Sequence, residues 1–209
     1  MSILVLISDT LTSPAAAGQI EYASPIFAAT PIGTQRGIVP TQQYYRLDSA
    51  LVGANAATTQ NIFGVGVTLS ASTVYEFEMV AALSKSAGTT SHNFGYGFGG
   101  TATLNNIGFL VSGSSQSSSF APLAAGGNMI QQWSAGAGNT NVNTAITSAA
   151  FYNYVVIKGT VSVNAGGTFI PQYTLSAAPG GAYTTQIGSF IRINPLSASG
   201  AATNVGAWS

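Results

Sequence analysis

The chain has 209 residues, of which only five are Lys or Arg and five are Asp or Glu, giving 5% charged residues and a formal net charge of zero. Nucleic-acid phosphates and anionic membranes bind to clusters of Lys and Arg. The chain has no such cluster, so both are excluded as partners. The sequence also has no Cys, which excludes disulfides, thiolate catalysis and Cys-ligated zinc.

The N-terminal third is expected to form an arm and a linker, residues 1–61. Its first apolar run, Ile3–Ile7, has no positive charge before it and Asp9 soon after it, which predicts a strand rather than a signal peptide. Prolines then punctuate residues 1–43 and favour an extended arm with short edge strands. Residues 44–61 lack alternation, and we expect a helical turn before Gly53.

Strand periodicity begins at Ile62. In the run Thr73–Val80, Glu76 and Glu78 share one face, whereas Tyr75 and Phe77 share the other. Similar runs of β-branched and aromatic residues follow, separated by Gly, Asn and Pro turns: His92–Phe98, Ile107–Val111, Met129–Trp133, Phe151–Val163, Thr168–Leu175 and Ser189–Ile193. About eight strands with this spacing predict an all-β fold, an antiparallel β-sandwich of jelly-roll type over residues 62–209.

One turn gives the clearest hairpin signal in the chain. Asn164–Gly167 separates the strand run Gly159–Val163 from the run Thr168–Leu175, and such a turn between two strand patterns is typical of a hairpin. We therefore expect these two strands to pair with each other.

Catalytic chemistry has few candidates. His92 is the sole histidine, and it is not accompanied by a Gly-x-Ser-x-Gly elbow. We expect it to be hydrogen-bonded in a turn or at an interface. A metal site would need more His or Cys, so the sequence predicts no catalytic residue, no metal and no cofactor.

The few charges suggest ion pairs instead. Glu76 and Glu78 lie two apart on a strand, about 6–7 Å from each other, a spacing near that of glycosidase carboxylates. We expect them rather to meet cations across strands or subunits, namely Lys85, Lys158 or an Arg. Two further ion pairs are expected, Glu21 with Arg36 and Arg46 with Asp48. These four residues, together with Glu76 and Glu78, are candidate subunit-interface residues.

Two aromatic positions permit a second interpretation. In the run Phe94–Gly100, glycines flank Tyr96 and Phe98, which could form a flat platform on which a sugar stacks, with Trp133 as a further candidate. We favour the other interpretation, in which the strand glycines let neighbouring backbone approach closely.

The scarcity of charge also predicts an assembly. Hydrophobic residues make up 46% and aromatic residues 10% of the chain, which excludes disorder. A free monomer without net charge tends to self-associate, because colloidal repulsion is missing. We expect identical or related subunits to cover much of this surface.

Several stretches resemble structural proteins of tailed bacteriophages. They cover most of the chain: Leu11–Tyr22, Gln35–Gly37, Phe63–Tyr75, Gly97–Gly108 and Gly159–Leu196. The resemblance implies a non-enzymatic virion component that assembles in the bacterial cytoplasm, and it carries no catalytic or ligand residues. Trimeric jelly rolls are common among such proteins, so a homotrimer is expected.

Two positions on the virion follow from this resemblance. A capsid decoration or cement protein would coat the head and have the major capsid protein, or other virion proteins, as its partner. A short tail-fibre or spike-tip protein would bind a host-surface glycan through Tyr96, Phe98 or Trp133. The first is favoured, because 209 residues leave no room for the long shaft and attachment domain of a fibre.

Overall fold

The computed structural model describes residues 8–120, 127–200, 202–206 and 208. Within these residues the regular elements are strands, and all the strand pairs are antiparallel, which confirms the predicted all-β class. No helix that could cross a membrane occurs in this part of the chain. The strand predicted at Ile3–Ile7 lies outside the described residues.

The larger of two facing sheets contains most of the long strands. Its order is β11 (Asn128–Ser134), β10 (Thr103–Gln116), β13 (Phe151–Ala165), β8 (Thr73–Lys85), β16 (Phe190–Ala198) and β4 (Gln43–Arg46). Beyond the end of β16, the other half of β8 pairs with β15 (Thr184–Thr185), which pairs in turn with β5 (Leu51–Val52). The long β8 therefore links both parts of this sheet.

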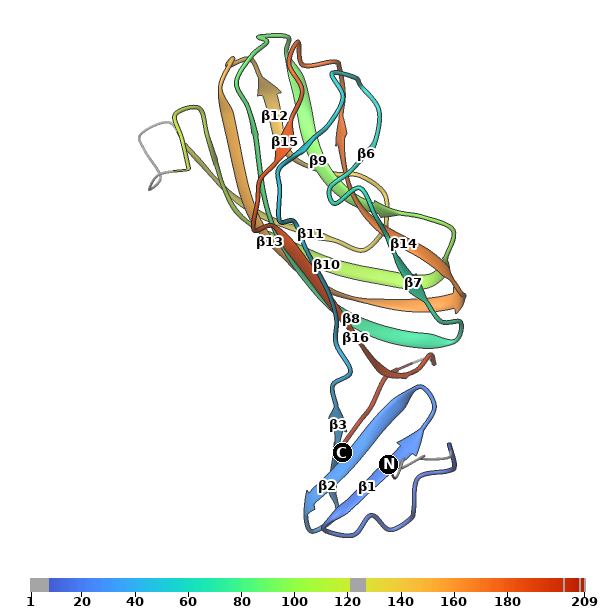
Figure 1. Ribbon diagram of the computed structural model, residues 1–209. Helices are drawn as coiled ribbons and strands as arrows, with labels where there is room; N and C mark the ends of the chain where they lie inside the picture. Colours follow the sequence, from blue (N-terminus) through green and yellow to red (C-terminus); the bar gives the residue numbers. More distant parts are fainter. Residues whose placement is uncertain (1–7, 121–126, 201, 207, 209) are drawn as a thin grey trace.

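The smaller sheet packs over the larger one (Figure 1). Its order is β12 (Thr140–Ile146), β9 (His92–Gly99), β14 (Gly167–Leu175) and β6 (Gln60–Asn61), with β7 (Val67–Leu69) also beside β14. The core between the sheets is rich in aromatic rings. Phe77 of the larger sheet meets Phe98 of the smaller one edge-on at 4.9 Å between ring centroids, and Phe98 stacks on Phe169 at 4.6 Å.

The alternation predicted for β8 is confirmed. Tyr75, Phe77 and Met79 are buried against the smaller sheet, whereas Glu76 is exposed and Glu78 is partly exposed on the outer face. Side chains of a strand point alternately to opposite faces, so a half-buried sheet selects this pattern.

The predicted hairpin around Asn164–Gly167 is wrong. β13 pairs with β8 and β10 in the larger sheet, and β14 pairs with β9, β6 and β7 in the smaller one. The turn is therefore a crossover between sheets. The backbone N–H of Ser72 donates to the Asn164 carbonyl at 3.3 Å, and that of Ala165 donates to Thr103 Oγ1 at 2.9 Å, which fixes the corner to the larger sheet.

The N-terminal region forms a third, small sheet at one end of the sandwich (Figure 1). It consists of β1 (Gln19–Ala23), β2 (Ile26–Ile32) and β3 (Gln35–Val39) in sequence order. Pro25 lies in the turn between β1 and β2, and Pro31 lies where the register of β2 and β3 shifts. Both positions suit a residue that has no backbone N–H to donate.

Residues 44–61, which were expected to form a linker, instead contribute short strands to the sandwich. β4 pairs with β16, β5 with β15, and β6 with β14. No helical turn precedes Gly53, where the chain is instead extended as β5. β4 shows no alternation because all four of its residues are exposed, and β5 and β6 have only two residues each. The pairing of all three depends on partners far along the chain.

Candidate functional site

The outer face of the larger sheet carries the densest group of charges. Strand register places Glu78 between Lys158 on β13 and Arg192 on β16. Glu78 Oε2 lies 3.0 Å from Lys158 Nζ and 3.0 Å from an Arg192 guanidinium nitrogen. The hydrogen bond from Lys158, reinforced by Arg192, holds the pKa of Glu78 below its usual value. The single carboxylate of Glu78 is thus shared by two cations, and the cluster keeps one net positive charge.

This ion cluster lies within a row of side chains that runs from one edge of the sheet to the other. The cross-strand neighbours are, in order, Trp133, Leu110, Lys158, Glu78, Arg192 and Tyr44. The ends of the row are exposed aromatics, since Trp133 is 62% and Tyr44 is 55% exposed. A Cβ atom on Gly108 would lie 2.9 Å from the Trp133 ring, so this glycine makes room for the indole.

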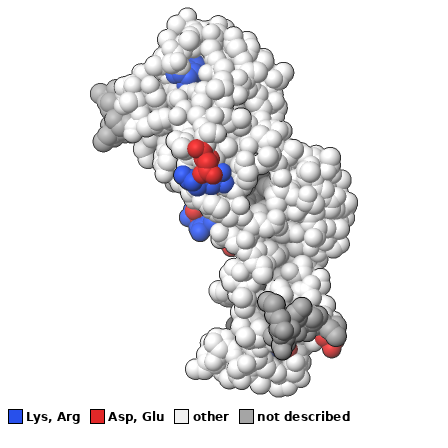
Figure 2. All heavy atoms as spheres, in the orientation of Figure 1, with Lys and Arg blue, Asp and Glu red and all other residues white. Residues whose placement is uncertain are grey.

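The rest of the visible surface is almost uncharged. Figure 2 shows acidic and basic side chains in contact with each other near the middle of one face, with few charges elsewhere on that face. Glu76 is exposed beside Thr160 and Asn194 in the strand register. It forms no ion pair with any described residue.

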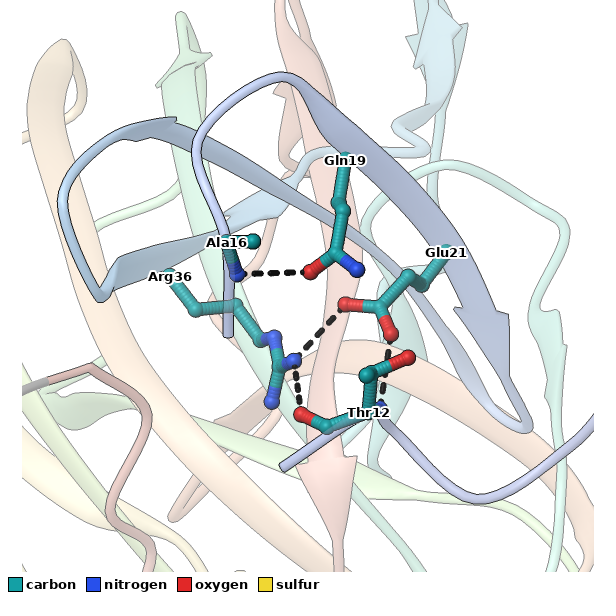
Figure 3. A network of polar contacts seen from close by, with 5 residues as sticks. All are labelled: Thr12, Ala16, Gln19, Glu21 and Arg36. Carbon is teal, nitrogen blue, oxygen red and sulfur yellow. Dashed lines mark hydrogen bonds and ion pairs between the residues drawn. The ribbon is translucent and has the colours of Figure 1, made fainter. Parts of the chain in front are cut away.

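A second charged network fixes the small N-terminal sheet. Glu21 on β1 and Arg36 on β3 approach to 2.8 Å, and both side chains are largely buried. The Glu21 carboxylate also accepts a hydrogen bond from the Thr12 backbone N–H at 2.7 Å, and Arg36 donates to the Thr12 carbonyl (Figure 3). The hydrogen bond from Thr12, together with Arg36, lowers the pKa of Glu21. The segment before β1 is thereby held against the sheet.

The third predicted ion pair, Arg46 with Asp48, is also present but exposed. The pairs Glu21–Arg36 and Arg46–Asp48 therefore form within one chain, as does the pairing of Glu78 with Lys158 and Arg192, whereas the cation expected beside Glu76 is not found among the described residues. The proposed role of these residues at subunit contacts stays a prediction.

Lys85, considered as a partner of Glu76 and Glu78, lies on the opposite face of β8. Only 2% of it is exposed, and burial lowers its pKa. Its ammonium group donates solely to backbone carbonyls among the described residues, those of Ala87, Gly88, Ser148 and Ala149. The strand alternation could have revealed this, because Lys85 has the same parity as Phe77.

His92 is a core residue rather than one of a surface turn. Nδ1 lies 2.7 Å from the Thr90 carbonyl oxygen, and Nε2 lies 2.8 Å from the Tyr183 hydroxyl. Burial lowers the pKa of His92. Both ring nitrogens are engaged in hydrogen bonds, as expected for a structural histidine.

Tyr96 and Phe98 do not form the sugar-stacking platform considered as the second interpretation, because both side chains are buried in the core. Their flanking glycines lie beneath the connection from β11 to β12. A Cβ atom would lie 2.2 Å from Asn139 Oδ1 at Gly95 and 2.9 Å from the Ala137 carbonyl at Gly97. Close backbone approach thus explains these glycines. Of the three aromatic candidates, only Trp133 is exposed.

An apolar groove lies where the two sheets end beside β4. It has a volume of about 340 Å³ and is lined by Tyr44, Tyr45, Phe63, Val65, Ile191 and Ile193, among others. Tyr45 contacts Phe63 edge-on, and Tyr44 stacks on Phe190. This groove could not be predicted from the sequence, because its walls come from four segments that are distant along the chain.

Comparison with protein-family models, with curated proteins and with solved structures found no match. Among the described residues, no cluster of three or more His, Cys, Asp or Glu side chains could hold a metal ion. The functional inference therefore rests on charge, burial and the edges of the sheets.

Proposed function

We propose that this chain is a non-enzymatic structural protein on the exterior of a tailed bacteriophage virion, where it coats or cements the capsid. One observation carries the proposal: the charged groups are largely neutralised within the chain, while several large apolar side chains are exposed. The most exposed of these are Ile20, Ile32, Val52, Met129, Trp133 and Trp208. Such a surface suits permanent contact with other proteins.

The strand pairing supports a jelly-roll topology. β8 pairs with β13, β9 with β12, and β10 with β11. The chain therefore forms a two-stranded antiparallel ribbon that folds over the core, placing alternate pairs in opposite sheets. Such alternation is typical of jelly rolls, an architecture that also occurs in viral capsid domains.

A homotrimer is part of the proposal. The accessible surface is 10663 Å², whereas about 9,000 Å² is usual for a monomer of this mass. The small sheet projects from the sandwich (Figure 1) and offers surface for subunits or for the major capsid protein. Light scattering of the purified protein gives the oligomer number directly.

Cryo-electron microscopy of the intact particle tests the proposed location. Dozens to hundreds of copies on the head are expected, and particles lacking the protein should lose their DNA at a lower temperature. A handful of copies at the tail would support the alternative position. Absence of the chain from purified particles would overturn both.

The aromatic groove favours one alternative, a short fibre or spike-tip protein that binds a host-surface glycan. Tyr44 and Tyr45 line the groove and are both exposed, and exposed aromatic rings suit sugar stacking. Glycan binding should then be lost in Tyr44→Ala and Tyr45→Ala. Tyr154→Ala is the matched control, because Tyr154 is a comparably exposed tyrosine outside the groove.

A further inference from the structure

β11 is an edge strand whose outer side is unpaired in the described structure. It pairs with β10 through seven consecutive residue pairs, Asn128–Ser134, without a register shift. It contains neither charge nor proline. An edge of this kind exposes a regular row of backbone donors and acceptors to which another strand can be added.

The other described edge strands carry features that hinder such pairing. β12, on the same side of the sandwich, is interrupted by two register shifts. β1 contains Glu21, β3 contains Arg36, and β4 has four residues with Arg46 at its end. β5, β6 and β7 have only two or three residues each. Among these strands, β11 alone is long, regular and uncharged.

The side chains of β11 are arranged almost symmetrically about its central residue, Gln131. Met129 and Trp133 lie two residues to either side of it on the same face, and they are 74% and 62% exposed. Gln131 is exposed between them. Its amide can both donate and accept hydrogen bonds, so it is complementary to a second Gln131.

We propose that β11 pairs with β11 of a second copy of this chain, antiparallel, about a two-fold axis at Gln131. Met129 then lies opposite Trp133 of the partner subunit, a sulfur–aromatic contact made twice by symmetry. Gln131 lies opposite Gln131 of the partner subunit. The two larger sheets become one continuous sheet.

A second copy fits this edge better than a charged partner. β11 has no ionic group with which to recognise one, whereas the two-fold pairing matches apolar with apolar and amide with amide. The inference goes beyond the proposed function, because the contact does not depend on a virion. In a trimer built through other surfaces, it would join one trimer to another.

Disulfide trapping tests the pairing directly. The chain has no cysteine, so Gln131→Cys can cross-link only to another copy, and directly opposite Cβ atoms lie about 4.5–5.5 Å apart. Mild oxidation, and in parallel a short bis-maleimide, should give a covalent dimer of Gln131→Cys. Asn141→Cys, exposed on the neighbouring edge β12, should stay uncross-linked. Equal trapping of both variants, or of neither, would overturn the proposal.

A charge at the centre provides an independent test. Gln131→Lys places two like charges opposite each other on the axis, and we expect association to weaken about tenfold. Circular dichroism and the melting temperature at high dilution should match the wild type, because Gln131 is exposed. Asn141→Lys should associate normally. An unchanged mass for Gln131→Lys in light scattering would show that copies meet elsewhere, whatever the location on the virion.

Discussion

Asn153 on β13 accepts a hydrogen bond of 3.0 Å from the Tyr96 hydroxyl on β9, across the interior between the two sheets. The Asn153 amide nitrogen donates to Asn143 Oδ1 on β12 at 2.9 Å, and Asn143 donates to Ser115 on β10 at 2.7 Å. All four side chains are buried. This chain of hydrogen bonds ties the two sheets together in one relative position.

Removing Asn153 should therefore destabilise the fold strongly. Asn153→Ala leaves the Tyr96 hydroxyl and the Asn143 carbonyl oxygen buried without this partner, and we expect the free energy of unfolding to fall by about 3 kcal/mol. Urea denaturation of the variant and the wild type measures this difference in the free energy of unfolding. Asn141→Ala, at an exposed position on β12, should change stability by less than about 0.5 kcal/mol. Similar losses in both variants would contradict the assigned role.

Lys85 should stabilise the fold by satisfying carbonyls rather than by pairing charge. Lys85→Met keeps the apolar stem but deprives the four surrounding carbonyls of their donor, with an expected loss of about 2 kcal/mol. Lys158→Met removes an exposed cation and should lose at most about 1 kcal/mol. Thermal denaturation of both variants compares the two losses of stability. A larger loss in Lys158→Met than in Lys85→Met would refute the prediction.

His92 should make the protein sensitive to mild acid. Its pKa is lowered by burial from 6.5, so below pH 6.5 the unfolded chain takes up a proton that the folded chain does not. Stability is then lost as the pH falls from 6.5 towards the folded-state pKa. His92→Gln should flatten the dependence of melting temperature on pH between about pH 7 and about pH 5.5. An unchanged slope would show that another group titrates there.

The contribution of Glu78 to folding stability should change with pH in a more acidic range than that of His92. Because its folded-state pKa lies below 4.5, its contribution is present above pH 4.5 and disappears as the pH falls through the folded-state value. Glu78→Gln should cost about 1 kcal/mol at neutral pH, since Lys158 and Arg192 then repel each other without a shared anion. The loss should shrink in about 1 M salt. Glu76→Gln is the matched control on the same strand and should be nearly neutral.

The parts of the fold predicted correctly are those set by local pattern. Alternation along β8 placed Tyr75 and Phe77 inside, and the shortage of charges made the pairing of Glu21 with Arg36 predictable. The partners of the strands on either side of the turn Asn164–Gly167 were not predictable, because the same turn residues occur in a hairpin within one sheet and in a crossover between two sheets. Only the partners of β13 and β14, remote in sequence, distinguish them.

The sequence around Tyr96 and Phe98 was also compatible with two arrangements. Along β9, small glycines alternate with Tyr96 and Phe98, a pattern that fits either an exposed platform or a strand covered on both faces. The loop containing Ala137 and Asn139 decides the matter by lying over the glycines. β12 was not predicted as a strand, since its sequence, TNVNTAI, has little apolar alternation. Its place at a sheet edge explains this.

The internal neutralisation of charge also determines how fast the protein meets its partners. A surface without a strong electric field cannot steer an approaching molecule, so encounters occur by undirected diffusion, with rate constants of about 10⁵–10⁶ M⁻¹s⁻¹. Ionic strength should change these rates little. For the proposed virion assembly, this predicts a dependence on high local concentration of the subunits rather than on long-range attraction.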